Sequence, residues 1–103
     1  MKVNNLFIKN EYLEILLKIF ETYCKKATIW AYGSRVKNEA HNGSDLDLTV
    51  IDWGETGKNV RKLRELLIES NIPFLVDINE YKSLPKSFQN EISKEYIKIW
   101  NKQ

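Results

Sequence analysis

Residues 28–50, T-I-W-A-Y-G-S-R-V-K-N-E-A-H-N-G-S-D-L-D-L-T-V, decide how this chain folds and where its chemistry lies. The segment 27–32 is rich in β-forming residues and stops at Gly33, which predicts a strand. The segment 45–51 alternates polar and apolar residues, which predicts a second strand. The polar residues 35–44, with Asn-Gly-Ser near their end, predict a loop or one short helical turn between the two strands.

Two aspartates on the second predicted strand need an explanation, because aspartate is depleted in strands. Residues i and i+2 of a strand point to the same side, so Asp45 and Asp47 share one face while the leucines beside them face the core. One interpretation is a solvated polar face. The other is a hard-cation site, since Mg²⁺ takes carboxylate oxygens and keeps open positions for water and substrate phosphates.

A third carboxylate follows on a third predicted strand, residues 74–79 (F-L-V-D-I-N), where Asp77 faces away from Val76 and Ile78. If this strand pairs with 45–51, about 4.8 Å away, Asp77 comes to lie beside the first two aspartates. Three converging carboxylates would repel one another without a cation. With two Mg²⁺ ions roughly 3.5–4 Å apart, they would clamp an in-line phosphoryl or nucleotidyl displacement.

The Gly33-Ser34 pair comes at the end of the first predicted strand. Glycine lets the backbone adopt positive φ and approach a ligand closely. If a short helical turn follows, its free N–H groups would point at an anion. Gly33 and Ser34 are therefore suited to phosphate oxygens, and Arg35 and Lys37 could add positive charge. An ordinary turn is the alternative.

The rest of the chain predicts helices around these strands. Apolar spacing predicts a helix over residues 10–26, another over 58–70, and a last one beginning near Pro85. The apolar stripe of that last helix is Phe88, Ile92, Tyr96, Ile99 and Trp100. The expected order is α-β-β-α-β-α, an α/β (α+β) two-layer fold with a small mixed sheet, helices on one face and the site on the open face.

Length and composition limit the functions that come into question. A chain of 103 residues predicts a single domain, residues 1–103. A net charge of +2 argues against a dedicated DNA-binding role. One cysteine and one histidine exclude a Cys/His zinc site and an intramolecular disulfide. We see neither a signal peptide nor an apolar run long enough for a membrane span, so a cytoplasmic location and no membrane partner are expected.

The complete pattern, Gly33-Ser34, ten residues, Asp45-Leu46-Asp47 and a later Asp77, resembles the minimal nucleotidyltransferase (MNT) family of the DNA polymerase β-like superfamily. The likeness extends from the first predicted helix to the last. It implies a nucleotidyltransferase fold and Mg²⁺-dependent transfer of a nucleoside monophosphate to an acceptor hydroxyl.

The resemblance also implies roles for these residues. Asp45 and Asp47 would hold both Mg²⁺ ions, and Asp77 would complete one metal site and help deprotonate the attacking hydroxyl. Gly33 and Ser34, with Arg35, would bind ATP or another nucleoside triphosphate, and pyrophosphate would leave.

Many small proteins of this family are encoded beside a HEPN-domain protein, and such pairs resemble toxin–antitoxin modules. The resemblance implies a HEPN partner in a hetero-oligomer, modified with AMP on a tyrosine and silenced. Two alternatives stay open: a catalytically silent antitoxin that acts by occlusion, and a transferase for a small molecule of the aminoglycoside type.

Overall fold

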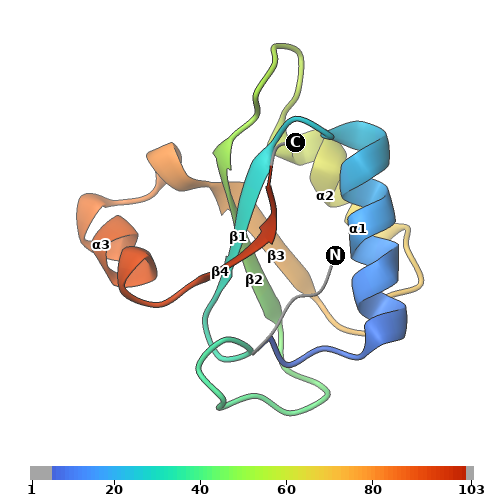
Figure 1. Ribbon diagram of the computed structural model, residues 1–103, viewed down its shortest axis with the longest axis vertical. Helices are drawn as coiled ribbons and strands as arrows, with labels where there is room; N and C mark the ends of the chain where they lie inside the picture. The colour runs from blue at the N-terminus through green and yellow to red at the C-terminus, as the bar shows by residue number, and fades with distance from the viewer. Residues whose placement is uncertain (1–5, 102–103) are drawn as a thin grey trace.

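The structure, a computed structural model, describes residues 6–101 and contains one four-stranded sheet flanked by helices (Figure 1). In chain order the elements are α1 (Asn10–Tyr23), β1 (Thr28–Tyr32), β2 (Leu46–Asp52), α2 (Val60–Ile68), β3 (Val76–Glu80), the short 3₁₀ helix η1 (Tyr81–Ser83), α3 (Lys86–Lys94) and β4 (Ile97–Trp100).

The sheet is mixed, as predicted, with the strand order β3-β2-β1-β4. β2 runs parallel to β3 and antiparallel to β1, and β4 pairs antiparallel with the other side of β1. The three predicted strands are present, with small shifts of their ends. One shift matters for the site: β2 begins at Leu46, so Asp45 lies just before the strand.

The core lies between the sheet and two helices. β1 and β2 turn alternate residues inward, and Ile29, Ala31 and Leu48 are fully buried. The helices α1 and α2 cover this face with their apolar sides, on which Phe20 and Leu63 are fully buried. Asn59 caps α2 by accepting a hydrogen bond from the Lys62 N–H at 2.9 Å.

The prediction of one long closing helix is wrong beyond Lys94, where α3 ends. The predicted stripe residues Ile99 and Trp100 belong instead to β4, and Tyr96 lies in the link between the two elements. The apolar residues Ile97 and Ile99 are two positions apart, which fits a strand. The spacing of three and four residues along the predicted stripe fits a helix equally well. Pairing with the otherwise open edge of β1 satisfies the backbone of 97–100 and decides between them.

Figure 1 shows α1 and α2 on one side of the sheet and α3 on the other. The two-layer arrangement is therefore confirmed for α1 and α2, but α3 does not cover the core face. It packs on the open face instead, where the Phe88 ring meets the Tyr32 ring edge-on at 5.8 Å. Within residues 6–101, no helix has the length and apolar character that crossing a membrane would require.

Candidate active site

The sheet register brings two of the predicted carboxylates side by side. Asp47 on β2 is paired with Tyr32 of β1 on one side and with Asp77 of β3 on the other. Paired residues of neighbouring strands present their side chains on the same face. Because β2 and β3 run parallel, Asp47 and Asp77 form one row across the open face, as the sequence predicted.

Gly33 places the loop backbone directly against this row. Its φ is +82°, a conformation that side-chain-bearing residues rarely adopt, and a Cβ at this position would collide with Oδ2 of Asp47. The chain then makes one tight turn, in which the Val36 and Lys37 N–H groups donate to the Gly33 carbonyl at 3.0 and 3.1 Å. Ser34, half-buried, lies at the start of this turn, which confirms the short turn predicted after the glycine.

The charges of Asp45 and Asp77 both act on the Asp47 carboxylate. Burial, together with the negative charges of Asp77 and Asp45, raises the pKa of Asp47 from 3.8 to about 6. Among residues 6–101, the ion pair within 4.0 Å joins Lys94 and Glu91 and includes none of these three carboxylates. The Asp47 group is therefore in a field that favours a cation.

A cavity of about 330 Å³ opens over this row. Gly33, Asp47 and Asp77 form its floor, and α3 forms the facing wall with Phe88 and Ile92. The remaining lining residues are Tyr32, Lys37, Asn79, Glu91 and Glu95.

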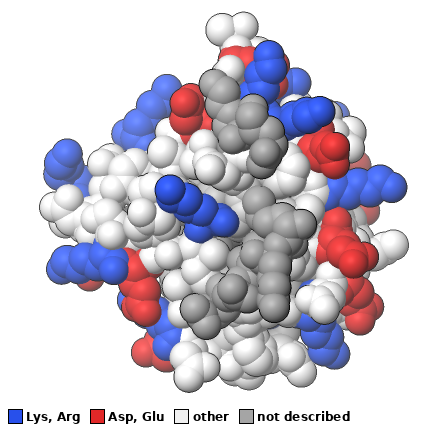
Figure 2. All heavy atoms as spheres, viewed as in Figure 1, with Lys and Arg blue, Asp and Glu red and all other residues white. Residues whose placement is uncertain are grey.

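On the face drawn in Figure 2, basic side chains are interspersed with acidic ones and do not gather in a single patch.

Two lining residues were not singled out as site residues from the sequence. The Asn79 side-chain N–H donates to the Tyr32 hydroxyl at 3.3 Å, and the Asn79 Oδ1 is buried without a partner among the described residues. Burial raises the pKa of Tyr32, and the charges of Asp47 and Asp77 act in the same direction. The signal for Asn79 was its spacing of two from Asp77, and for Tyr32 its place directly before Gly33.

Three of the predicted site residues, Ser34, Arg35 and Asp45, do not line this cavity. Ser34 and Asp45 lie close to the lining residues Gly33 and Asp47 in the chain, whereas Arg35 points elsewhere. Its guanidinium lies on the other side of the loop, where it donates hydrogen bonds to backbone carbonyls. This geometry does not support the prediction that Arg35 contacts a triphosphate. Lys37, two residues later, lines the cavity and is exposed.

The donor set suits a hard cation. Within the described part of the chain, no three His, Cys, Asp or Glu side chains form a ready cluster of metal ligands. Mg²⁺, however, is ordinarily bound through one or two carboxylates together with substrate phosphates, and seldom by an all-protein cage. The oxygen ligands of Asp45 and Asp47 and the raised pKa of Asp47 fit such a shared site.

Three comparisons with known proteins agree with this arrangement. Residues 14–103 match the family described as "Polymerase beta, Nucleotidyltransferase". The "Probable protein adenylyltransferase MntA" of Haemophilus influenzae is 36% identical over 97 residues, which cover 93% of this chain and 85% of that protein.

A solved structure, described as a crystal structure of a toxin-antitoxin with AMP-PNP, superposes with a TM-score of 0.67. It covers 88% of this chain and 74% of its own, at 20% sequence identity, and so supports the fold alone. The family match spans most of the chain, and the relative is similar over most of both chains. The chain therefore belongs to the polymerase β nucleotidyltransferase family and is a nucleotidyltransferase.

Proposed function

We propose that this protein transfers AMP from ATP, with Mg²⁺, to a tyrosine hydroxyl of a HEPN-domain partner and thereby acts as an antitoxin. The observation that carries the proposal is the position of Asp47. It is flanked by Asp77 and Asp45, and the Gly33 backbone lies directly against it. Such a site gathers negative charge beside a loop suited to phosphate, which is what transfer from a metal-bound triphosphate requires.

The residues divide the work between them. Gly33 and Ser34 bring the turn backbone to the triphosphate, and Lys37 adds a cation at the cavity wall. Asp45 and Asp47 would hold Mg²⁺, which when bound neutralises charge on the phosphates and on the leaving group. Asp77, exposed at the cavity floor, takes the proton of the attacking hydroxyl. That hydroxyl oxygen bonds to the α-phosphorus as the bond to pyrophosphate breaks.

A protein acceptor is supported by the relatives. The Haemophilus influenzae relative is named a protein adenylyltransferase, and the solved structure is a toxin-antitoxin with an ATP analogue. The assignment of the acceptor to a HEPN tyrosine rests on the resemblance in the sequence pattern. The open cavity in front of Asp77 leaves room for an acceptor side chain supplied by another molecule.

The test is label transfer. The protein is incubated with Mg²⁺, ATP labelled at the α-phosphate and the product of the neighbouring gene, the proposed HEPN-domain partner. Label should move to the partner, and mass spectrometry should place one or more AMP groups on a tyrosine. D47N should abolish transfer, whereas E21Q, which removes one exposed charge from α1, should leave it unchanged. Absence of transfer with all four nucleoside triphosphates would overturn the proposal.

A protection assay separates transfer from occlusion. Cells that express the toxic partner are supplied with the wild-type protein or with the double variant D45A/D47A. If transfer is the function, only the wild-type protein protects the cells. If the double variant protects them fully, the protein acts by binding alone.

A further inference from the structure

Arg35 is buried, with 2% of its surface exposed, although it carries a full positive charge. Its guanidinium donates twice to the Ser44 carbonyl, from Nε at 2.9 Å and from Nη2 at 2.7 Å. Nη2 also donates to the Asn42 carbonyl at 3.0 Å, and Nη1 donates to the Phe7 carbonyl at 2.6 Å. The guanidinium therefore donates four hydrogen bonds to three backbone carbonyls, and these charge-assisted bonds compensate for its burial.

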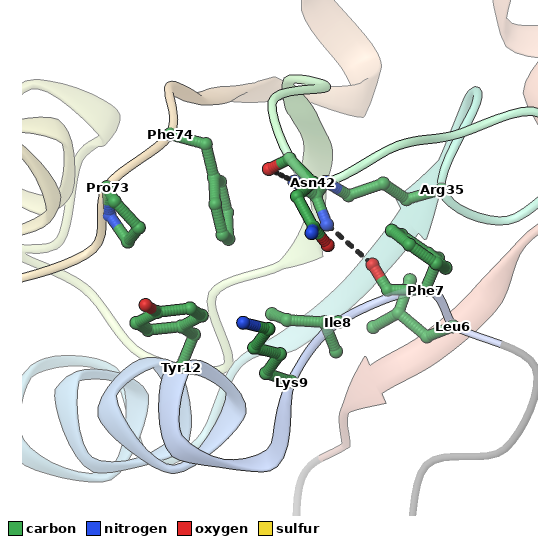
Figure 3. A pocket seen from close by; sticks show the side chains of 9 residues that line it. All are labelled: Leu6, Phe7, Ile8, Lys9, Tyr12, Arg35, Asn42, Pro73 and Phe74. Carbon is green, nitrogen blue, oxygen red and sulfur yellow. Dashed lines mark hydrogen bonds between the residues drawn. The ribbon is translucent and has the colours of Figure 1, made fainter.

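The surroundings of Arg35 hold the guanidinium in one orientation. Figure 3 shows it between the segment that carries Phe7, the loop that carries Asn42, and the ring of Phe74. The guanidinium carbon lies 4.0 Å from the centre of the Phe74 ring and 5.7 Å from that of Phe7. These residues line a pocket of about 430 Å³ that is separate from the cavity over Asp47.

The Ser44 carbonyl is the group through which Arg35 reaches the site. It belongs to the peptide that joins Ser44 to Asp45, and a planar peptide moves as one unit. On the far side of Asp45, the Leu46 N–H donates to the Leu75 carbonyl at 2.9 Å as β2 begins. Asp45 is itself exposed and lies before the strand, so these two anchors define where its backbone sits.

We propose that Arg35 is a positioning residue: its planar fork fixes the Ser44–Asp45 peptide and so holds the Asp45 carboxylate beside Asp47, ready to share a divalent cation. This inference rests on the proposed function, because it assigns Asp45 to metal binding. It differs from the role that the sequence resemblance implied, since Arg35 acts through the loop and does not touch phosphate.

The test uses R35K, which keeps the charge but has one nitrogen in place of the fork. R61K, the same change on an exposed arginine of α2, is the matched control. Mn²⁺ stands in for Mg²⁺, and its affinity is measured by calorimetry on the protein alone. The amide signals of residues 42–46 are followed by NMR. We expect R35K to weaken Mn²⁺ binding about tenfold and to shift or broaden those amides, with the rest of the spectrum unchanged.

The transfer assay adds a second readout. In R35K the Mg²⁺ concentration for half-maximal rate should rise about tenfold, and excess Mg²⁺ should restore the rate, while the KM for ATP at saturating Mg²⁺ stays near the wild-type value. A merely structural role would not single out the metal in this way. R61K should match the wild type in every measurement.

A variant of milder effect covers the case in which R35K does not fold. F74L removes the aromatic ring that packs against the Arg35 guanidinium but leaves all the hydrogen-bond donors of Arg35 in place. It should weaken Mn²⁺ binding by a smaller factor than R35K does. Unchanged Mn²⁺ affinity and unchanged loop amides in a folded variant would overturn the inference. A wild-type protein that binds Mn²⁺ but transfers no nucleotide would overturn the proposed function and leave this inference standing.

Discussion

Replacing Asp47 with asparagine should abolish nucleotidyl transfer and at the same time stabilise the metal-free protein near pH 7. In the folded protein, burial and the charges of Asp77 and Asp45 raise the pKa of Asp47 from 3.8 to about 6. A shift of roughly two pKa units corresponds to about 3 kcal/mol against the ionised form. Because Asp47 is partly exposed, solvent screening reduces this, and we expect a gain of about 1 kcal/mol in D47N.

The pH dependence of this gain follows from the direction of the shift. The folded state binds the Asp47 proton more tightly than the unfolded state does. Wild-type stability therefore falls as the pH rises from 3.8 to about 6, whereas D47N lacks this loss. The difference between the two proteins should be absent near pH 3.5, grow through that window and be complete near pH 7.

The assay is thermal and urea unfolding in buffer with a chelator, at a series of pH values. For a domain of this size, about 1 kcal/mol raises the Tm by about 4 °C or more. E21Q serves as the control for the loss of one exposed carboxylate. Added Mg²⁺ should then stabilise the wild type more than D47N, because a ligand stabilises the state that binds it. A D47N protein that is equally or less stable near pH 7 would refute the reasoning that burial and the charges of Asp77 and Asp45 destabilise ionised Asp47.

Three further predictions concern single groups. G33A should cost roughly 1 kcal/mol or more of stability, because φ is +82°, and should cut transfer sharply by displacing the Asp47 carboxylate; unfolding and label-transfer assays measure both. The transfer rate should fall as the pH drops below about 6, since protonation of Asp47 removes a metal ligand. A pH–rate profile with and without excess Mg²⁺ tests this, because excess Mg²⁺ should move the fall in rate to lower pH. Burial raises the pKa of the Cys24 thiol to about 12, so a thiol reagent near pH 8 should react with it only after denaturant unfolds the protein, and rapid reaction of the native protein would contradict its burial.

The strands and the carboxylate row could be predicted because they depend on local patterns. Alternation of period two along residues 45–51 assigned the leucines to the core, and the aspartates of that strand were left on the open face. A glycine at the end of a strand predicted the turn that follows Gly33. The parallel pairing of Asp47 with Asp77 was expected only on the condition that the two strands are neighbours, and the sheet register met that condition.

Other features depend on contacts between distant parts of the chain. The apolar residues at 96–100 fit a helix or a strand by spacing, and only the free edge of β1 made 97–100 a strand. The end of α3 then follows, because the chain must turn back from the open face to reach that edge. The helix α3 packs against Tyr32 and forms the outer wall of the cavity. This position could not be predicted from the periodicity of the helix alone.

The sequence by itself determined the chemistry of this protein: which residue types stand at which spacing, and hence the family, the paired carboxylates and the glycine turn beside them. Only the tertiary structure decided how those groups are held. Arg35 lies next to the glycine-serine pair in the chain, yet its donors reach the carbonyls of Phe7, Asn42 and Ser44. A buried guanidinium must satisfy its donors wherever acceptors are in reach, and their position is a property of the folded loop.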